Sequence, residues 1–311
     1  MQCSRCEKSG VYKSIGQVYC KDHFLSYFET KVFKTIRKYK LYEKGDQICV
    51  AASGGKDSLA LLYMTMLYCK KYDIDYYALA IDEGIKEYRD HTLSDLKIFC
   101  KQYDIPLKIV SFKKKFGASL DEVQDKAIND LNKKPCTVCG IFRRTLLNRT
   151  ARDMKATKLA TGHNLDDESQ SFFMNTLLGN MRHNASLGPV TGLNKNKKFV
   201  QRVKPLYFVL EKETRLFTFL RKFKVDFKEC PNIHLSFRAV VRDQLNQIED
   251  KFPGAKHKIV NSFLEVLPLL KEHYRREKPF SYCNKCGDAC SGETCNSCKL
   301  EDQLCLEVES S

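Results

Sequence analysis

One short segment decides the fold of this chain: Ser53-Gly54-Gly55-Lys56-Asp57-Ser58, which follows an apolar run at 47–52 and precedes a helical pattern that extends to about Lys71. The two glycines permit a tight turn with outward-facing N–H groups, and the following helix adds its positive N-terminal end. Lys56 contributes a charge, and the serines contribute hydroxyl groups. The segment therefore predicts a phosphate-binding loop, although its spacing is not that of a Walker A motif. An ordinary Gly-Gly turn is the alternative.

Strand and helix patterns alternate beyond this loop. Apolar runs at 76–81, 107–112 and 158–161 predict further strands, and the stretches 91–103, 120–131 and 140–154 predict helices. This alternation predicts an α/β fold, a doubly wound parallel sheet with helices on both faces. Ligands bind beyond the carboxyl ends of the strands in such sheets, and the loops that begin at Asp82 and Gly162 each follow a predicted strand. We therefore expect both residues to border the same crevice as the phosphate-binding loop.

The later of these loops, Gly162-His163-Asn164-Leu165-Asp166-Asp167-Glu168, permits two interpretations. Asn164 can cap the next helix, and acidic residues in a first turn suit the helix dipole. The functional interpretation makes one of these acids a magnesium ligand or a proton acceptor beside the phosphates. The residues alone favour neither interpretation, and both stay open.

Cysteines gather at both ends of the chain, which has fifteen of them. The N-terminal set reads CxxC followed by CxxH, and the C-terminal set contains two CxxC pairs. Two such pairs direct four ligands at one tetrahedral zinc ion, and closed sites of this kind stabilise small folds. Cys290 is a rival ligand in the second set. The predicted zinc ligands are Cys3, Cys6, Cys20 and His23, and then Cys283, Cys286, Cys295 and Cys298.

The net charge of +15 over 311 residues is concentrated in two stretches. Segment 131–160 contains eight basic residues and one acid, and segment 194–224 contains ten and two. This excess predicts a polyanionic partner, a nucleic acid or a lipid surface, and the interleaved aromatic residues favour nucleic acid. The N-terminus has no apolar signal segment, and the longest uncharged apolar run, 58–69, is too short to span a bilayer. We therefore expect a cytoplasmic protein without membrane association.

The loop at 53–58 resembles the PP-loop of the ATP pyrophosphatases, enzymes that cleave ATP between its α and β phosphates. Three further motifs narrow the resemblance: Pro135-Cys136-Thr137-Val138-Cys139, the loop at 162–168, and Glu229-Cys230-Pro231. Together with the terminal zinc modules, the set is similar to the tRNA 2-thiouridine synthases of the TtuA and cytoplasmic tRNA 2-thiolation protein group. The related 2-thiocytidine synthases lack both zinc modules, which favours uridine as the target.

This resemblance implies an ATP-dependent tRNA 2-thiolation, in which the C2 oxygen of a tRNA uridine is adenylated and then replaced by sulfur. It implies that Cys136, Cys139 and Cys230 hold a 4Fe–4S cluster with its fourth iron open to an exogenous sulfur. A persulfide relay with a resolving thiol is the rival chemistry, and a redox-inert CxxC at a helix end is the alternative without a function. Asp167 is the preferred acid at the reacting centre, ahead of Asp166.

The implied cofactors are ATP, Mg²⁺, the 4Fe–4S cluster and two Zn²⁺ ions. The residues assigned to ATP are Ser53, Gly54, Gly55, Lys56, Asp57, Ser58, Asp82 and Gly162. The implied partners are tRNA, a second copy of the chain in a homodimer, and a sulfur donor, either free sulfide or a ubiquitin-like carrier protein. The pattern Ser236-Phe237-Arg238 with Arg242 also resembles the family and is expected to face tRNA.

Four units follow from these assignments: an N-terminal zinc module (1–30), a PP-loop catalytic domain (31–230), a helical extension (231–278), and a zinc ribbon with a tail (279–311). Two other functions compete with tRNA 2-thiolation. One is a non-catalytic zinc protein that binds RNA or scaffolds an assembly. The other is a different adenylating PP-loop enzyme, such as a 2-thiocytidine synthase. The intact loop at 53–58 argues against the first, and the three-cysteine set argues against PP-loop enzymes that need no sulfur.

Overall fold

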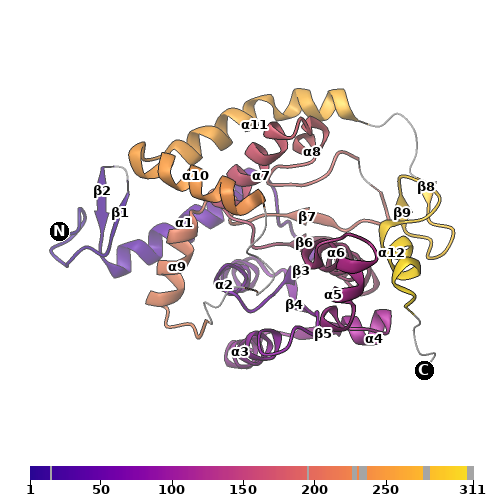
Figure 1. Ribbon diagram of the computed structural model, residues 1–311. Coiled ribbons are helices and arrows are strands. Elements are labelled where there is room, and N and C mark those ends of the chain that lie inside the picture. Colours follow the sequence, from indigo (N-terminus) through magenta and orange to yellow (C-terminus); the bar gives the residue numbers. More distant parts are fainter. Residues whose placement is uncertain (15, 195, 226–229, 231–236, 276–280, 307–311) are drawn as a thin grey trace.

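A five-stranded parallel sheet forms the centre of the molecule (Figure 1). The structure is a computed structural model that describes residues 1–14, 16–194, 196–225, 230, 237–275 and 281–306. The strand order is β5-β4-β3-β6-β7, so the chain winds outward from β3 in both directions, which confirms the predicted doubly wound α/β fold. The strands are β3 (Gln47–Ala51), β4 (Asp75–Asp82), β5 (Leu107–Ser111), β6 (Lys158–Ala160) and β7 (Gln201–Val203).

Helices cover both faces of this sheet because its strands are apolar on both sides. Along β4, Ala78 and Ala80 pack into one hydrophobic cluster, while Tyr77, Leu79 and Ile81 pack into another on the opposite face. The first cluster includes residues of α1 (Lys21–Lys38), α2 (Lys56–Tyr72), α3 (Arg89–Gln102) and α9 (Glu211–Leu220). The second includes residues of α4 (Phe112–Phe116), α5 (Leu120–Asn129), α6 (Pro135–Asp153) and α12 (Asn296–Leu304).

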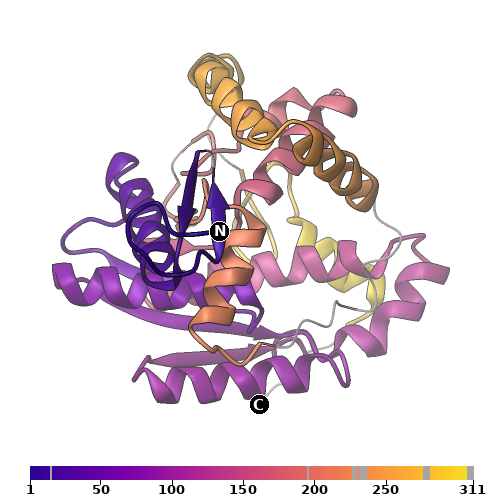
Figure 2. The same cartoon turned by 90° about the vertical axis from the view of Figure 1, so that its left-hand side faces the viewer.

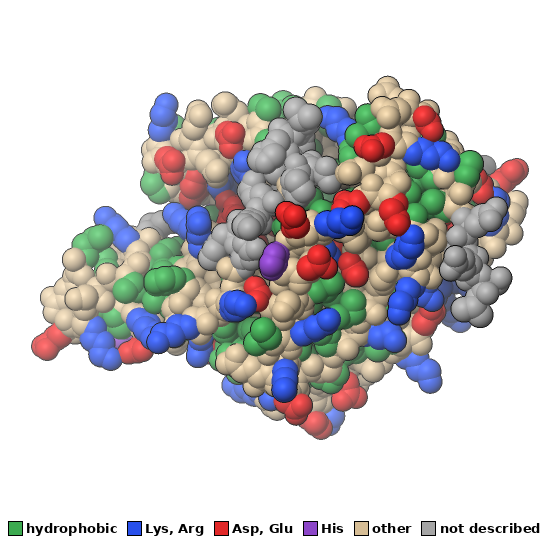
Figure 3. Space-filling view, turned by 60° about the horizontal axis from the view of Figure 1, so that its bottom comes forward, with side chains coloured by type: hydrophobic (Ala, Val, Ile, Leu, Met, Phe, Trp, Pro, Cys, Tyr) green, Lys and Arg blue, Asp and Glu red, His purple; other side chains and the backbone are tan. Residues whose placement is uncertain are grey.

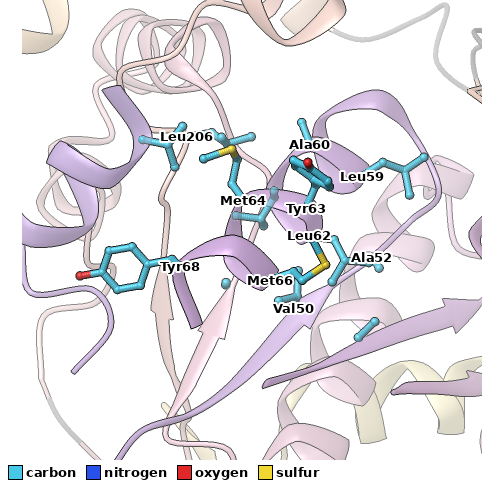
Figure 4. Packing of buried hydrophobic residues seen from close by; sticks show 14 of the residues in the cluster. Val50, Ala52, Leu59, Ala60, Leu62, Tyr63, Met64, Met66, Tyr68 and Leu206 are labelled. Atoms are coloured by element: carbon cyan, nitrogen blue, oxygen red, sulfur yellow. The ribbon is translucent and has the colours of Figure 1, made fainter. Parts of the chain in front are cut away.

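Helix α2 is buried on nearly all sides along its first three turns. Each residue from Ser58 to Met66 is buried, and Figure 4 shows Leu62 and Met66 of α2 close to Val50 and Ala52. A helix that is apolar all round belongs in a protein core rather than at its surface. The loop at the N-terminus of α2 is therefore carried by a rigid, enclosed element.

A further group of helices lies beyond the β7 edge of the sheet. In Figures 1 and 2, α10 (Phe237–Lys251) and α11 (Ala255–Tyr274) lie across α7 (Leu165–Leu177) and α8 (Met181–Ala185). Phe172 of α7 packs against Phe263 of α11 with ring centroids 4.5 Å apart. The helices α10 and α11 are separated at Pro253-Gly254, where Gly254 has a φ of 90°. This group covers the start of α7, which follows one of the predicted site loops.

The two cysteine-rich ends each form a small hairpin followed by a helix. Strands β1 (Tyr12–Ser14) and β2 (Gln17–Tyr19) precede α1, and β8 (Ser281–Tyr282) and β9 (Ala289–Cys290) precede α12. The hairpins lie at opposite ends of the molecule in Figure 1. Helix α1 runs through residue 30 into the main core, and the division into four units stays a prediction. Among the described residues, no helix is long and apolar enough to cross a membrane.

The largest difference from the sequence-based boundaries concerns α6. Helical periodicity predicts a start at Gly140, but the helix begins at Pro135, which occupies a position in its first turn. Proline suits this position because the first N–H groups of a helix have no partner within the helix. Cys136 and Cys139 therefore lie in the first turn of α6 and not in the loop that precedes it.

Candidate functional site

The phosphate-binding loop connects β3 to α2 and is closed by its own serines. The Gly54 N–H donates to Ser58 Oγ at 3.0 Å, and Ser58 Oγ donates to the Gly55 carbonyl at 2.9 Å. Gly54 has a φ of +87°, and a Cβ there would lie 2.3 Å from the carbonyl oxygen of Thr92. A side chain at position 54 would be both strained and blocked. The tight turn predicted from the two glycines is confirmed.

Lys56 is the cation of this loop. Its ammonium lies 2.9 Å from Asp57 Oδ2 and 2.7 Å from Glu211 Oε1, and 20% of its side chain is exposed. Burial would lower the pKa of Lys56, but the two carboxylates outweigh burial and raise its pKa above the usual value. Lys56 is therefore charged at neutral pH. The carboxylates of Asp57 and Glu211 hold its ammonium group in place, and a phosphate group of a ligand could replace them as its partner.

The loop at 162–168 lies directly beside the phosphate-binding loop. Asn164 Nδ2 donates to Asp57 Oδ1 at 3.1 Å. A Cβ at Gly162 would come within 3.2 Å of the Asp57 backbone, so the two loops touch at that glycine. Asp82 ends β4, the neighbour of β3 in the sheet, and its carboxylate accepts a hydrogen bond from the Gly84 N–H at 3.0 Å. The three loops therefore follow adjacent parallel strands, as expected.

Two of the three acids at the start of α7 have a structural partner in the interior. Asp166 pairs with the buried Lys256 of α11 and accepts from the Glu211 N–H, while Glu168 pairs with Lys204 at 2.6 Å. The side chains of Asp166 and Glu168 are 8% and 3% exposed, respectively. These acids stabilise the contact of α7 with its neighbours, which leaves one acid accessible.

Asp167 is that more accessible acid, with 29% of its side chain exposed. It completes the predicted cap: the Asp167 N–H donates to Asn164 Oδ1, and the Asn164 N–H donates to Asp167 Oδ2, both at 3.1 Å. Its other carboxylate oxygen lies 3.2 Å from Arg238 of α10. Partial burial raises the pKa of Asp167 to about 6, against the opposing effect of the Arg238 cation. A carboxyl group that titrates near neutrality beside the phosphate-binding loop suits proton transfer.

Cys136, Cys139 and Cys230 converge next to this crevice. Cys136 is exposed and Cys139 is half-buried in the first turn of α6, and the half-buried Cys230 packs against the same hydrophobic cluster as Cys139. Burial raises the pKa of the Cys139 thiol to about 12, and negative charge on Cys230 and Cys136 contributes, while Arg143 opposes the shift. Three thiols within electrostatic reach of one another form a donor set that fits an iron–sulfur cluster.

An ion-pair network with a buried centre connects the phosphate-binding loop to the cysteine-bearing helix. Arg89, at the start of α3, donates to the carbonyl oxygens of Ile81 and Ser53, the latter at 2.5 Å. Its Nε lies 2.8 Å from Glu83 Oε2, and Glu83 Oε1 lies 3.7 Å from Arg143 Nη1 of α6. Nothing in the sequence marks Arg89 or Glu83 as site residues, because only the folded chain brings their partners together.

Replacing Arg89 with alanine is expected to destabilise the fold by about 3 kcal/mol, because the change removes the buried partner of the Glu83 carboxylate and leaves it only the half-exposed Arg143 at 3.7 Å. Urea unfolding followed by circular dichroism measures this free energy. The matched control is Lys97→Ala, an exposed position of the same helix, which is expected to change stability by less than about 0.5 kcal/mol. Equal stability of the two variants would show that the network contributes nothing to folding.

The terminal cysteine sets have the geometry of closed metal sites. In each set, the four ligand atoms lie within 4.8 Å of one another. The Sγ atoms of Cys6 and Cys20 are 3.7 Å apart, as are those of Cys286 and Cys295. Two sulfurs bound tetrahedrally to one zinc ion are about 3.8 Å apart. Both predicted sets therefore fit zinc, and the rival ligand Cys290 instead donates to the Gly292 carbonyl at 2.8 Å.

The two basic stretches lie side by side in the folded chain. Asn148 of α6 donates to the Lys198 carbonyl at 2.8 Å and accepts from the Val200 N–H at 3.0 Å, which joins segment 131–160 to segment 194–224. Figure 3 shows acidic and basic side chains mixed over the face that it presents. Arg238 lies 3.2 Å from Asp167 and donates to Ser171, and 41% of its side chain is exposed, so its contact with RNA stays a prediction. Ser236 lies outside the described residues.

Comparisons with known proteins agree with this site. The model of the PP-loop domain family matches residues 25–249. The chain is 34% identical to the tRNA-5-methyluridine(54) 2-sulfurtransferase of Pyrococcus horikoshii, over 100% of this chain and 97% of that protein. It is also 34% identical to the Cytoplasmic tRNA 2-thiolation protein 1 of Dictyostelium discoideum, over 96% of this chain and 83% of that protein.

A solved structure resembles the whole chain. The U34-tRNA thiolase NcsA from Methanococcus maripaludis, solved with its 4Fe–4S cluster, has a TM-score of 0.83 and 34% identity. The match covers 98% of this chain and 96% of that one, so both cysteine-rich ends fall within the similarity. The chain therefore belongs to the PP-loop domain family and, within it, to the tRNA 2-thiolation proteins.

Proposed function

We propose that this protein catalyses the ATP-dependent 2-thiolation of a uridine in tRNA. The observation that carries the proposal is that residues suited to ATP binding and cysteines suited to sulfur transfer lie near one another at the same edge of the sheet. The phosphate-binding loop and Asp167 lie beside each other, and the Arg89–Glu83–Arg143 network joins them to the helix that bears Cys136 and Cys139. The names of the relatives in P. horikoshii and D. discoideum support the same reaction.

The first chemical step takes place at the phosphate-binding loop. Lys56 leaves its carboxylate partners to contact the phosphates of ATP, which are held with Mg²⁺, and stabilises the charge that develops on the departing pyrophosphate. Backbone N–H groups of Gly54 and Gly55 and the hydroxyl groups of Ser53 and Ser58 exchange their hydrogen bonds within the loop for bonds to the phosphate chain and orient it. The C2 oxygen of uridine attacks the α-phosphate, and AMP becomes the group that the second step displaces.

The second step replaces the activated oxygen with sulfur. A 4Fe–4S cluster held by Cys136, Cys139 and Cys230 would present the sulfur that attacks C2, and the M. maripaludis relative supports such a cluster. Arg143 lies close enough to Cys139 to favour its thiolate, as the opposing effect on that pKa indicates. In this scheme, the carboxylate of Asp167 accepts a proton from the reacting uridine or returns a proton to it.

The terminal modules and the partners complete the proposal. Zinc in both cysteine sets stabilises the hairpins. Because each set supplies four protein ligands, the zinc ion has no open coordination position for catalysis. We assign the protein to the cytoplasm on the name of the D. discoideum relative, and we propose a homodimer supplied with sulfur as free sulfide or as the thiocarboxylate of a ubiquitin-like carrier. The names of the relatives point to two positions, U34 and 54, so the target uridine is a matter for experiment.

The direct test incubates anaerobically purified protein with ATP, sulfide and unmodified tRNA transcripts. The proposal predicts AMP, pyrophosphate and one 2-thiouridine per tRNA, and mass spectrometry of nuclease fragments identifies its position. RNA binding without formation of AMP would contradict the proposal and favour a non-catalytic zinc protein. A thiolated cytidine would favour the 2-thiocytidine synthase alternative.

The rate of thiolation is expected to depend on pH through Asp167. Its pKa of about 6 means that the carboxylate form decreases below pH 6, so the rate is expected to fall about tenfold per pH unit there and to be level above about pH 7. Single-turnover rates between pH 5 and 8 measure this profile. Arg238→Ala removes a cation that lowers this pKa and is expected to move the acidic limb to higher pH. An unmoved limb would exclude Asp167 as its origin.

A further inference from the structure

Two adjoining cavities form one groove beside the proposed site. The larger, about 1120 Å³, lies among α7, α8, α11 and the chain that leads into β7. The smaller, about 200 Å³, lies between α6, β7 and the C-terminal cysteine module. Asn148, Phe199 and Arg202 line both cavities, so the two adjoin at these residues and together extend from the C-terminal module to α11.

Unneutralised cations follow this groove along its whole length. Its lining includes Arg144, Arg182, Lys197, Arg202 and Lys271, and none of these forms an ion pair with any residue in the described part of the chain. The lining pair Lys204 and Glu168 is internally neutral. The groove therefore has a net positive charge that the described chain does not balance, and an anionic ligand would be attracted to it.

Two of these cations face each other across the smaller cavity without an acid between them that is free to pair. Arg144 of α6 and Arg202 of β7 both line it, and burial and mutual repulsion lower the pKa of Arg202. Asp288 also lines this cavity, but its two oxygens are occupied by Arg149 at 2.5 Å and Arg152 at 2.7 Å. Two guanidinium groups in one partly desolvated cavity repel each other, and an anion between them would relieve that repulsion.

The groove also contains an exposed aromatic side chain and extends toward the phosphate-binding loop. Phe199, which lies where the two cavities join, is 45% exposed. His163 and Glu168 line the larger cavity, and Asn164, next to His163, donates to Asp57 of the phosphate-binding loop. A chain that enters at the C-terminal module and follows the groove therefore arrives beside the proposed adenylation site.

We propose that this groove binds the single-stranded RNA segment that carries the target uridine, with a phosphate between Arg144 and Arg202 and a base stacked on Phe199. The assignment of RNA rests on the function proposed above. A series of cations with an interposed aromatic ring matches the alternation of phosphates and bases in a single strand. A duplex does not fit this arrangement, because its bases stack on one another and the target must leave the stack to react.

The test measures binding of unmodified tRNA by the full-length protein over a range of salt concentrations. The double variant Arg144→Gln, Arg202→Gln is expected to bind about tenfold more weakly at low salt, with a slope of log affinity against log salt that is shallower by about 1. Phe199→Leu is expected to weaken binding about tenfold without a change in slope. Thermal unfolding of each variant verifies that the fold is retained, and Arg144→Lys with Arg202→Lys is expected to restore the slope.

The matched control is Lys34→Gln, Arg37→Gln, which removes two exposed cations from α1, away from the groove, and is expected to leave affinity and slope unchanged. Wild-type affinity and slope in the double glutamine variant would overturn the groove proposal, even if the wild-type protein thiolates tRNA. Failure of the wild-type protein to bind tRNA or to form AMP would overturn the proposed function instead. Equal losses in the groove and control variants would show a diffuse electrostatic effect and also contradict a specific groove.

Discussion

Lys56→Ala is expected to abolish ATP-dependent thiolation, with a loss of at least about 10³-fold in rate, and to leave the affinity for tRNA nearly unchanged. Lys56 is the cation of the phosphate-binding loop, held by carboxylates of Asp57 and Glu211 from two different elements. Removal of one preorganised charge from a transition state costs about 10² to 10³ in rate, and here it also removes a ground-state contact with ATP. The groove proposed to bind tRNA is lined by other cations, among them Arg144 and Arg202.

Two measurements separate these effects. Chromatography of AMP in single-turnover reactions gives the chemical rate, and fluorescence anisotropy of labelled tRNA gives its affinity. The control is Lys70→Ala, an exposed lysine in the last turn of the same helix, which is expected to retain wild-type rates. A Lys56→Ala enzyme that forms AMP at the wild-type rate would show that the loop does not bind the reacting phosphates.

The loop and the sheet could be predicted because their determinants are local in sequence. Parallel strands buried on both faces read as apolar runs, and the tight turn at Gly54 needs a residue without a side chain. The terminal metal sets could be predicted equally well, since each CxxC or CxxH pair brings two ligands together within one turn. Of the two interpretations of the loop at 162–168, the structure bears out the cap, which Asn164 forms with Asp167, while the catalytic role of Asp167 stays a prediction.

The remaining parts of the site depend on contacts between distant segments. Glu83 and Arg89 read as ordinary charged residues, yet both are buried and connect Ser53 to α6. Arg238 lies against Asp167 because α10 packs on α7. Hydrophobic periodicity and motif spacing cannot predict such contacts between residues that are far apart in the sequence. The helix start at Pro135 had a local signal, a proline suited to the first turn, that outweighs the apolar periodicity from Gly140 onward.

Cys136→Ser is expected to remove the iron–sulfur cluster and to reduce thiolation by more than about 10²-fold, while ATP binding persists. A cluster needs thiolate ligands, and a serine hydroxyl is a poor substitute for soft sulfur. Cys136 is the best position for this test because it is exposed at the start of α6, so the isosteric change creates no cavity in the core. Cys139 packs against the hydrophobic cluster, and its replacement would confuse a loss of ligand with a loss of packing.

The measurements are iron and sulfide content, the broad brown absorption of the anaerobically purified protein, and single-turnover thiolation. Cys305→Ser is the control, because Cys305 is exposed and lies outside all three cysteine sets, and it is expected to retain both colour and activity. A colourless wild-type protein that thiolates tRNA at full rate would exclude the cluster. If that activity required a donor of persulfide-level sulfur in place of sulfide and left a disulfide after turnover, it would favour the persulfide relay. Loss of activity in Cys136→Ser with normal iron content would also exclude Cys136 as an essential ligand. Only joint loss of iron and sulfur transfer in this one variant agrees with a cluster that delivers the sulfur, since neither the relay nor a redox-inert CxxC requires iron.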